Sequence, residues 1–396
     1  MKFKKIFSLI LTAIFLISSA SVDAKNSKKE TAEKKLPDKK ISAPKAGTWQ
    51  PERKIGLLSG VTQVTLQMSE PCVMTDADTE KVLAKIQPNR SFSLDFASLK
   101  AKAVEIRGEK VQLKDLQVTV NGKKYFGGVQ INKNSGSLTV INLIPVEEYL
   151  RGVVPEEMSP SFQKEALKAQ AVAARSFTLK NTGRHKSEGY DLCATTHCQA
   201  YEGVSTANTQ TDAAVKETRG EILYYNGAAA MTNFHTDSGG MTESSKDVWG
   251  TDAPYLQAVE ELEKQTQAWN VTLSKTDFSD RMGAEFGNLQ KIDLSDLVIG
   301  KSASDRTKSG RIKFAIFVGS KKTVKMSGTD IRSKFSLPST LCNIKIQGGE
   351  VVFEGFGRGH GVGMSQWGAE AYAKSGWTYD KILLHYYKGT EIKKLY

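Results

Sequence analysis

The chain has 396 residues, of which 39% are hydrophobic and 25% are charged. This composition excludes a wholly disordered chain and a coiled coil, and the length suffices for two or three domains. The formal net charge is +12, but residues 1–46 carry eleven Lys and four acidic residues, a net of +7. Because the rest is only mildly basic, and nucleic-acid binders concentrate positive charge on a folded face, we expect no nucleic-acid partner.

The first residues predict export. The basic start MKFKK precedes an apolar run that is shorter than the roughly 20 residues of a membrane span, and small residues then follow around Ala24. We expect a signal peptide over residues 1–24, a secreted, periplasmic or cell-envelope location, and membrane contact only if this segment stays uncleaved. The Lys-rich, Pro-containing residues 25–46 are expected to be a disordered linker.

Residues 47–145 are predicted to form a β-rich N-terminal region. Short runs of alternating hydrophobic residues are separated there by Gly, Asn and Lys turns, a pattern typical of strands. The runs are Val64–Leu66, Phe92–Leu94, Val118–Val120, Val129–Ile131 and Leu138–Ile141.

The strongest helix signal runs from Phe162 to Lys180, where Ala and other strong helix formers dominate. A short helix over residues 146–150 precedes it. Lys168 and Arg175 stand seven residues apart, on one face of the long helix. Because an unpaired buried charge is costly, we expect each of them either to have a charged partner or to face an anionic or hydroxylated ligand.

The C-terminal half mixes both kinds of element. It predicts an α+β fold with a core over residues 146–390 and an insertion at about 258–345. Apolar patterning and the turn dipeptide Asn226-Gly227 indicate the individual elements. They are a helix over 211–218, a strand over 221–225 with a partner over 229–236, a β run over 311–318, and helices near 366–374 and 379–387.

Three long motifs in this core carry a resemblance to a known family. They are VVPEEM followed by EALKAQAVAARSF, then FHTDSGGMTESSKDVWG with PYL, and then GRGHGVGMSQWGAEAYAKSG. Together they resemble the SpoIID/LytB family of bacterial cell-wall proteins, over about residues 142–387. The resemblance implies a core that forms a glycan groove, with peptidoglycan glycan strands as substrate. Members include lytic transglycosylases and proteins named amidase enhancers, so a cell-wall amidase is a second implied partner.

The resemblance also implies a catalytic acid, the Glu before Met at the start of the long helix, which is Glu157 here. Chemistry supplies a separate reason, because protonating a glycosidic oxygen near neutral pH needs a carboxylic acid with a raised pKa, and apolar neighbours such as Val154 and Met158 favour one. The competing interpretation is a Glu that merely opens the next helix. Glu156 is the rival acid. Adjacent residues of an extended chain point in opposite directions, so only one of the two can face the cleft.

Glycoside hydrolases normally pair two carboxylates, and the sequence offers no second acid in a comparable setting. A lytic transglycosylase needs only one, because the 6-hydroxyl of the sugar attacks its own anomeric carbon. The resemblance implies the glycan as substrate, and the single acid favours cleavage between MurNAc and GlcNAc to a 1,6-anhydro product. The alternatives are lysozyme-like hydrolysis of the same bond and a non-catalytic enhancer of an N-acetylmuramoyl-L-alanine amidase.

Residues 191–201 contain two thiols and an imidazole, namely Cys193, His197 and Cys198. Thiolates with imidazoles suit Zn²⁺, and His185 is a candidate fourth ligand. Some members of the family that the chain resembles bind zinc through this loop. A Cys193–Cys198 disulfide is the alternative in an exported protein. No cofactor is expected to be required for the reaction, and zinc would be structural.

Seven further residues are candidates for substrate binding. Several of them lie in family motifs where flanking glycines allow the backbone to approach a ligand closely. For His360, a role in holding the fold is an equal alternative. The candidates are Lys168, Arg175, Tyr201, His235, Ser238, His360 and Gln366.

Overall fold

The structure is a computed structural model that describes residues 50–264 and 266–396. The expected signal peptide (1–24) and linker (25–46) lie outside the described residues. Within the described ranges, no helix is long and apolar enough to cross a membrane. The fold is α+β, as the sequence predicts.

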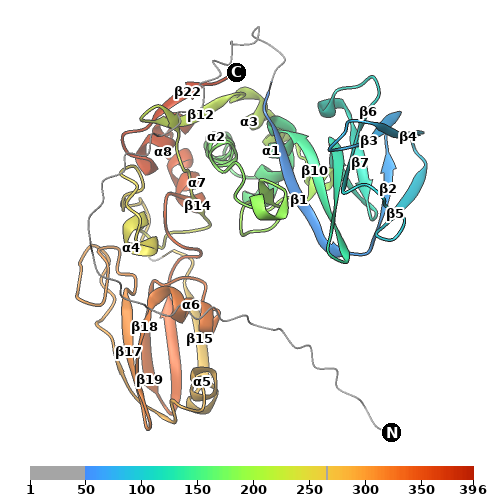
Figure 1. Cartoon of the computed structure of the whole chain (residues 1–396). Coiled ribbons are helices and arrows are strands. Elements are labelled where there is room, and N and C mark those ends of the chain that lie inside the picture. Colours follow the sequence, from blue (N-terminus) through green and yellow to red (C-terminus); the bar gives the residue numbers. More distant parts are fainter. Residues whose placement is uncertain (1–49, 265) are drawn as a thin grey trace, which may run out of the picture. The chain divides into compact units, whose positions relative to one another are not determined.

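Two antiparallel sheets form the N-terminal region (Figure 1). One has the strand order β5-β2-β7-β8, and the other has the order β1-β10-β9-β6-β3-β4. The short strand β11 (Leu192–Cys193), from the Cys-His loop of residues 191–201, adds to the second sheet in parallel with β1. All five predicted β runs lie in strands of these sheets. The strands are β1 (Glu52–Val61), β2 (Gln63–Met68), β3 (Cys72–Asp76), β4 (Val82–Ile86), β5 (Ser91–Asp95), β6 (Ala103–Gly108), β7 (Gln117–Val120), β8 (Lys123–Phe126), β9 (Gly128–Asn134) and β10 (Ser137–Pro145).

Strand β10 connects the sheets to the helices. Every residue from Leu138 to Pro145 is buried, which explains its mostly apolar sequence. Its last residue leads directly into helix α1 (Val146–Glu157), and a single hydrophobic core runs from the strands into α1 and helix α2 (Lys164–Lys180). The site residues on α1 are therefore held by the same core as the sheets.

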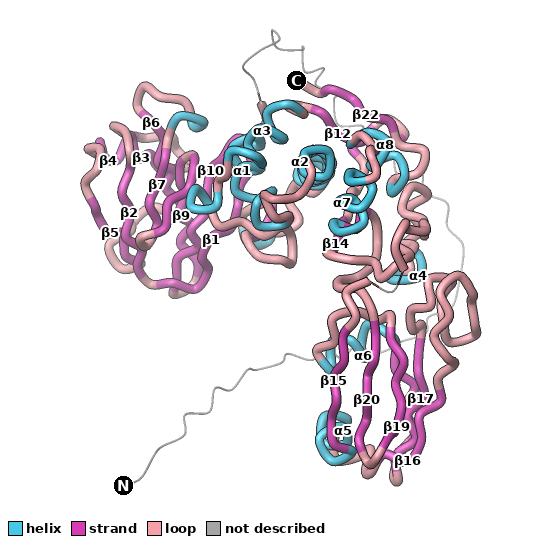
Figure 2. Tube along the Cα trace, turned by 180° about the vertical axis from the view of Figure 1, so that it is seen from behind, coloured by secondary structure: helices cyan, strands magenta, loops and turns pink. Residues whose placement is uncertain are grey.

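Helix α2 is packed on several sides, as its small residues predict. Its Ala residues at positions 166, 169, 171, 173 and 174 have no exposed surface. The elements around it come from distant parts of the sequence (Figures 1 and 2). Besides α1, they are α3 (Thr209–Glu217), β12 (Glu221–Tyr225), α7 (Gln366–Lys374) and α8 (Tyr379–Tyr386).

The predicted partner strand of β12 is shorter than expected. Across the turn, in which Asn226 and Gly227 both have positive φ, the partner strand is limited to β13 (Ala228–Ala229). The chain then leaves this sheet, and β14 (Phe234–His235) pairs in parallel with β21 (Met364–Ser365). The backbone hydrogen bonds of β14 thus go to a segment 130 residues downstream, which local patterning does not reveal.

The insertion has two three-stranded sheets and a hydrophobic core of its own. The helix α4 (Ser245–Trp249) precedes the insertion in the chain. Outside the insertion, the last strand, β22 (Glu391–Lys394), pairs with the other edge of β12. The elements of the insertion are β15 (Trp269–Ser274), α5 (Lys275–Met282), β16 (Leu289–Asp293), β17 (Phe314–Gly319), β18 (Thr323–Ser327), α6 (Gly328–Phe335), β19 (Cys342–Gln347) and β20 (Glu350–Gly355).

Candidate functional site

Glu157 is the last residue of α1, not part of an extended segment as expected. The helix continues beyond residue 150 because Val153 and Val154 are fully buried in the core and hold its last turn in place. Glu157 is half-buried, whereas Glu156 is exposed. Helical geometry thus separates the two adjacent acids, and only Glu157 faces the protein.

Two amide groups hold the Glu157 carboxyl. The Ala200 N–H donates to Oε1 (2.9 Å), and the Gln366 side chain donates from Nε2 to Oε2 (3.2 Å). Gln366 is the first residue of α7, and its position is set by the pairing of β21 with β14. Of the seven candidate substrate-binding residues, Gln366 is the one that the structure brings into contact with Glu157.

The environment of Glu157 disfavours its ionised form. Burial raises the pKa of Glu157, the two hydrogen bonds oppose this rise, and the nearby charge of Glu156 adds to it. The position at a helix C-terminus, the negative end of the helix dipole, acts in the same direction. The carboxyl therefore keeps its proton to a higher pH than an ordinary Glu, as a general acid requires.

A cavity of about 300 Å³ lies beside the start of α7. Trp367, next to Gln366, lines it and is 42% exposed, with its ring edge-on to Phe162 at 5.0 Å between centroids. An exposed indole offers a flat apolar surface on which a sugar ring can stack. The other lining residues are Asp237, Glu261, Leu262, Glu263, Thr266, Gln267, Gly368, Glu370, Ala371 and Lys374.

The structure brings all four predicted metal ligands together. Ligand atoms of His185, Cys193, His197 and Cys198 lie within 4.8 Å of one another, and both thiols are free. Three contacts between sulfur and nitrogen measure 3.4–3.6 Å. Ligands at about 2.3 Å (S) and 2.0–2.1 Å (N) from a tetrahedral Zn²⁺ would be separated by about 3.6 Å. The donor set and its spacing therefore fit a Zn²⁺ ion.

The outer contacts of this cluster also fit a metal site. Glu188 accepts a hydrogen bond from Nδ1 of His185 (2.6 Å), which leaves Nε2 on the side of the Cys198 sulfur. Tyr190 donates its hydroxyl to the other Glu188 oxygen (2.6 Å) and stacks on the His185 ring. Carboxylates that orient a ligating His in this way are the usual second shell of zinc.

The Cys-His loop and the catalytic candidate are connected through the backbone. Ala200, whose N–H holds Glu157, follows Cys198 by two residues. Within the same loop, burial raises the pKa of the Cys193 thiol, but hydrogen bonds from Thr195, His197 and Cys198 outweigh it and lower this pKa to about 6. These hydrogen bonds also tie the loop together. Anything that fixes this loop therefore also fixes a hydrogen-bond donor of Glu157.

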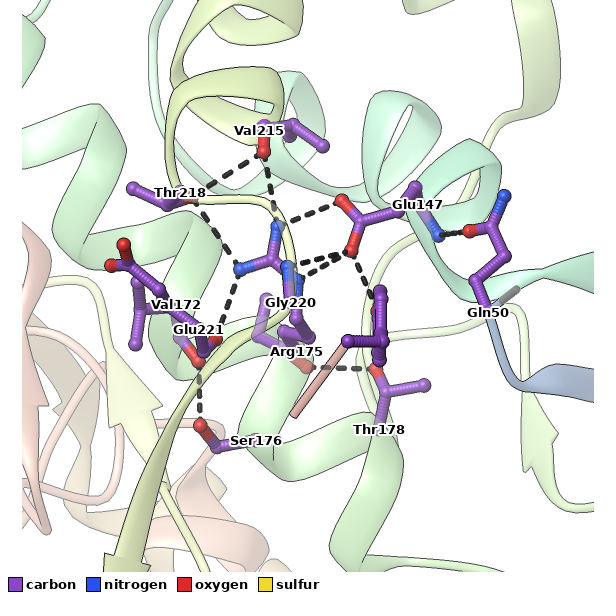
Figure 3. A network of polar contacts seen from close by, with 12 residues as sticks. Gln50, Glu147, Val172, Arg175, Ser176, Thr178, Val215, Thr218, Gly220 and Glu221 are labelled. Atoms are coloured by element: carbon purple, nitrogen blue, oxygen red, sulfur yellow. Dashed lines mark hydrogen bonds and ion pairs between the residues drawn. The ribbon is translucent and has the colours of Figure 1, made fainter. Parts of the chain in front are cut away.

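Arg175 has a charged partner, one of the two alternatives that its sequence position allowed, and does not have the substrate-binding position that was the other. It has no exposed surface and makes a bidentate ion pair with Glu147 at 2.8 and 2.9 Å (Figure 3). Its remaining donors reach Thr218 and two backbone carbonyls. Glu147 and Glu157 are ten residues apart on α1, about 15 Å along the helix axis. Arg175 therefore braces the opposite end of α1.

The other five candidates also have contacts within the protein, and three of them are described first. Lys168 forms ion pairs with Glu165 and Glu217, both at 3.0 Å. Tyr201 and Ser238 are fully buried and donate to Asn142 and Glu261. Side chains without exposed surface cannot contact a glycan, so the substrate-binding role expected for Tyr201 and Ser238 is corrected to a structural one.

The two histidines of the glycine-flanked motifs lie near each other, with ring centroids 5.5 Å apart. His235 is buried, and its Nδ1 lies 3.2 Å from the Val362 carbonyl. His360 is partly exposed, and its Nδ1 accepts from the Val362 N–H (3.0 Å). Neither contacts Glu157 through a hydrogen bond in the described structure.

Sequence reasoning missed three contributors to the site. The Ala200 N–H carries no side-chain signal at all. Glu188 could have been found as a carboxylate three residues after a candidate ligand, His185. Trp367 could have been found as an aromatic residue within the SQWG motif.

Comparison with known proteins places these features in a family. Residues 134–225, which include Glu157 and the Cys-His loop, match the family model described as Stage II sporulation protein (SpoIID). Residues 255–363, which cover the insertion, match a domain of unknown function, DUF8618. The α+β fold and the site thus define a SpoIID-type domain that carries a separate inserted module.

Individual relatives support the same family. Stage II sporulation protein D of Bacillus subtilis (strain 168) is 36% identical over 270 residues, which cover 63% of this chain and 75% of that protein. The Amidase enhancer of the same organism is 32% identical over 323 residues, covering 70% of this chain and 45% of that protein. An uncharacterized protein of Brachyspira hyodysenteriae is 32% identical over 285 residues, covering 69% and 73%. The chain belongs to the SpoIID family.

Proposed function

We propose that this protein is an exported peptidoglycan-cleaving enzyme, a lytic transglycosylase that uses Glu157 as its single acid and base. The observation that carries this proposal is the setting of the Glu157 carboxyl. It is half-buried, its pKa is raised, two neutral amide donors hold it, and no cation of the described residues pairs with it. Such a carboxyl keeps its proton to a higher pH than an ordinary Glu, and its anion is stabilised after it has given up the proton.

The reaction follows from these contacts. Glu157 donates its proton to the oxygen that links MurNAc C1 to GlcNAc, and this C–O bond breaks. The carboxylate, stabilised by the Ala200 N–H and the Gln366 amide, then accepts the proton of the MurNAc 6-hydroxyl as its oxygen bonds to C1. The product is a 1,6-anhydro sugar, no water is consumed, and Glu157 is protonated again. An intramolecular nucleophile gains a large effective concentration, so one carboxyl suffices.

The Cys-His cluster has a supporting role in this proposal. His185, Cys193, His197 and Cys198 would hold a Zn²⁺ ion, which supplies a rigid cross-link for the loop and no chemistry at the sugar. Glu188 orients His185, and the braced loop presents the Ala200 N–H to Glu157. Zinc is thus expected to affect activity through position alone.

The test is mass analysis of purified peptidoglycan digested by the purified protein. Release of fragments ending in 1,6-anhydro-MurNAc supports the transglycosylase. Fragments with a reducing MurNAc, heavier by one water molecule, would instead indicate lysozyme-like hydrolysis of the same bond. Glu157→Gln should release neither, while the matched variant Glu156→Gln, which changes the adjacent exposed acid, should still release fragments at acidic pH.

The similarity to an amidase enhancer supports a second candidate function. Here the protein would bind glycan strands and stimulate a cell-wall amidase without cleaving anything itself. The same digestion distinguishes the two functions. If wild-type protein alone releases no glycan fragments, but raises the yield of peptides that an added N-acetylmuramoyl-L-alanine amidase liberates, the enhancer function replaces the enzymatic one.

A further inference from the structure

A second cavity, of about 200 Å³, lies where the DUF8618 segment meets α4 and the glycine-rich segment around His360. We call it the insertion cavity. Its volume exceeds the roughly 30 Å³ that one water molecule occupies in the liquid, so it admits a small organic group. Its lining residues are Glu243, Asp247, Val248, Trp249, Thr307, Arg311, Ile312, Lys313, Ser327, Gly328, Thr329, Arg332, Thr340 and His360.

Arg311 is the most deeply buried cation of this cavity, with 2% of its surface exposed. Its Nη1 donates to the Met241 carbonyl (2.8 Å) and the Ser309 hydroxyl (3.0 Å), and its Nη2 donates to the Ser238 carbonyl (2.7 Å). All of these acceptors are neutral. The Nε of Arg311 has no hydrogen-bond partner among the described residues. A buried guanidinium with an unused donor is costly unless an anion compensates it.

Two further cations line the same cavity. Arg332 is half-buried, and its Nε donates to the Leu337 carbonyl (3.2 Å). Lys313 is exposed. Within residues 50–264 and 266–396, no carboxylate lies at ion-pair distance from Arg311, Lys313 or Arg332. Burial lowers the pKa of both arginines, and for Arg311 it outweighs the opposing charges of Glu243, Glu261 and Asp237.

The acids of the cavity are already engaged. Glu243 accepts hydrogen bonds from the Ser244 N–H (2.9 Å) and the Ser309 hydroxyl (2.6 Å), and Asp247 accepts one from the Ser244 hydroxyl (2.8 Å). Burial, together with the charges of Arg332 and Arg311, lowers the pKa of His360 to about 4, so it is neutral at pH 7. The negative charges of Glu243, Glu261 and Asp237 also act on Arg311 from beyond ion-pair distance, so the positive charge of the cavity is small and suits a monoanion better than a dianion such as phosphate.

We propose that the insertion cavity binds a carboxylate of the cell-wall polymer, with Arg311 and Arg332 as its anchors. Guanidinium groups bind carboxylates through paired N–H donors, which a lysine cannot supply. Trp249 is 46% exposed and lies 5.2 Å from the His360 ring, so it offers a flat apolar face to the group that bears the carboxylate. The inserted module would thereby add a substrate contact that the catalytic core does not make.

Peptidoglycan carries carboxylates of two kinds, the lactyl group of muramic acid and the free carboxylates of its peptides. Assigning the ligand to this polymer rests on the proposed function, whereas the carboxylate chemistry rests on the cavity alone. Four small probes separate the sources. N-acetylmuramic acid is compared with N-acetylglucosamine, which lacks the lactyl acid, and N-acetyl-D-alanine is compared with its neutral amide.

The experiment uses the full chain labelled with 5-fluorotryptophan, whose five Trp residues give separate ¹⁹F signals. Trp249→Phe identifies the Trp249 signal. We expect at least one of the two acids to shift that signal saturably, with an affinity at least ten-fold above that of its neutral counterpart. The acid that does so identifies the source. No probe contains the bond that Glu157 is proposed to break, so binding survives even if the enzymatic function is wrong.

Variants test the anchors. Arg332→Met should weaken binding of the acid at least ten-fold, Lys313→Met less, and Arg90→Met, which removes an exposed arginine of the N-terminal sheets, not at all. The proposal is overturned if neither acid binds better than its neutral counterpart, if inorganic phosphate binds as tightly as the acids, or if Arg332→Met and Arg90→Met behave alike. If Arg332→Met unfolds, Lys313→Met replaces it in the test. Lys313 is exposed, so its loss should leave the fold intact and still weaken the binding of the acid.

Discussion

The two ends of α1 each carry a glutamate, and their surroundings are opposite. Glu147, in the first turn, has a bidentate guanidinium partner in Arg175 and further donors in Gly220 and Tyr396. Glu157, in the last turn, has two neutral amide donors and access to solvent. A carboxylate fixed by a buried cation serves the fold, whereas one without a cation can gain and lose a proton. Sequence position alone does not distinguish them.

Of the changes to these two glutamates and their partners, neutralising Glu157 should have the largest effect on activity. Glu157→Gln keeps the shape and the hydrogen bond from Ala200 but removes the proton donor, so glycan cleavage should fall by about 10²–10⁴-fold, the usual contribution of a general acid. Fragment release from purified peptidoglycan measures this. Glu156→Gln is the matched control, and equal losses in the two variants would contradict the assignment of Glu157.

Removing the cation at the other end should affect stability instead. Arg175→Met leaves Glu147 buried without its partner, which should cost about 3–5 kcal/mol of unfolding free energy. Denaturant unfolding measures this, and the folded fraction should retain normal specific activity. Lys168→Met, on the same helix but in more exposed ion pairs, should cost far less. A large loss of activity at unchanged stability would restore the groove role that the sequence suggested for Arg175.

The Cys-His loop allows the neutral donors of Glu157 to be disturbed indirectly. We expect one zinc per chain, two reactive thiols after chelation, and reduced cleavage by the metal-free protein because Ala200 is released. Glu188→Gln should weaken zinc binding by about 10–100-fold, the usual second-shell effect, while Glu350→Gln, an exposed control in β20, should not. Absence of metal together with absence of thiol signal would instead support the Cys193–Cys198 disulfide.

The smallest effect concerns the pH dependence of cleavage. Because Glu157 acts in its protonated form and its pKa is raised, activity should fall as the pH rises through that pKa. The charge of Glu156 contributes to the rise, so Glu156→Gln should move this limb of the pH profile to lower pH. A limb that does not move would separate Glu156 from the titration.

Protein stability checks the same pKa independently. Below the ordinary Glu pKa of about 4.3, Glu157 is protonated in both the folded and the unfolded chain. Above it the unfolded chain ionises first, so the wild type loses stability as the pH rises to the folded pKa. Glu157→Gln should therefore gain stability relative to wild type between acidic and neutral pH. A stability difference independent of pH would contradict the raised pKa.

The sequence by itself located many of the elements and the residues of the candidate site. Alternation located five strands, helix-forming residues located α2 and α7, and the motifs identified Glu157, Gln366 and the Cys-His loop. These signals are local, because strand alternation, helix propensity and motif spacing all depend on residues a few positions apart.

Only the tertiary structure decided which charges are satisfied. The sequence placed Lys168 and Arg175 on one face of a helix but could not show that Glu147 and Glu217 reach them from other elements. Likewise the N–H of Ala200, the partners of Ser238 and the neutral acceptors of Arg311 depend on segments that meet across tens to hundreds of residues. The role of a buried polar group is set by its partners, and long-range packing chooses those partners.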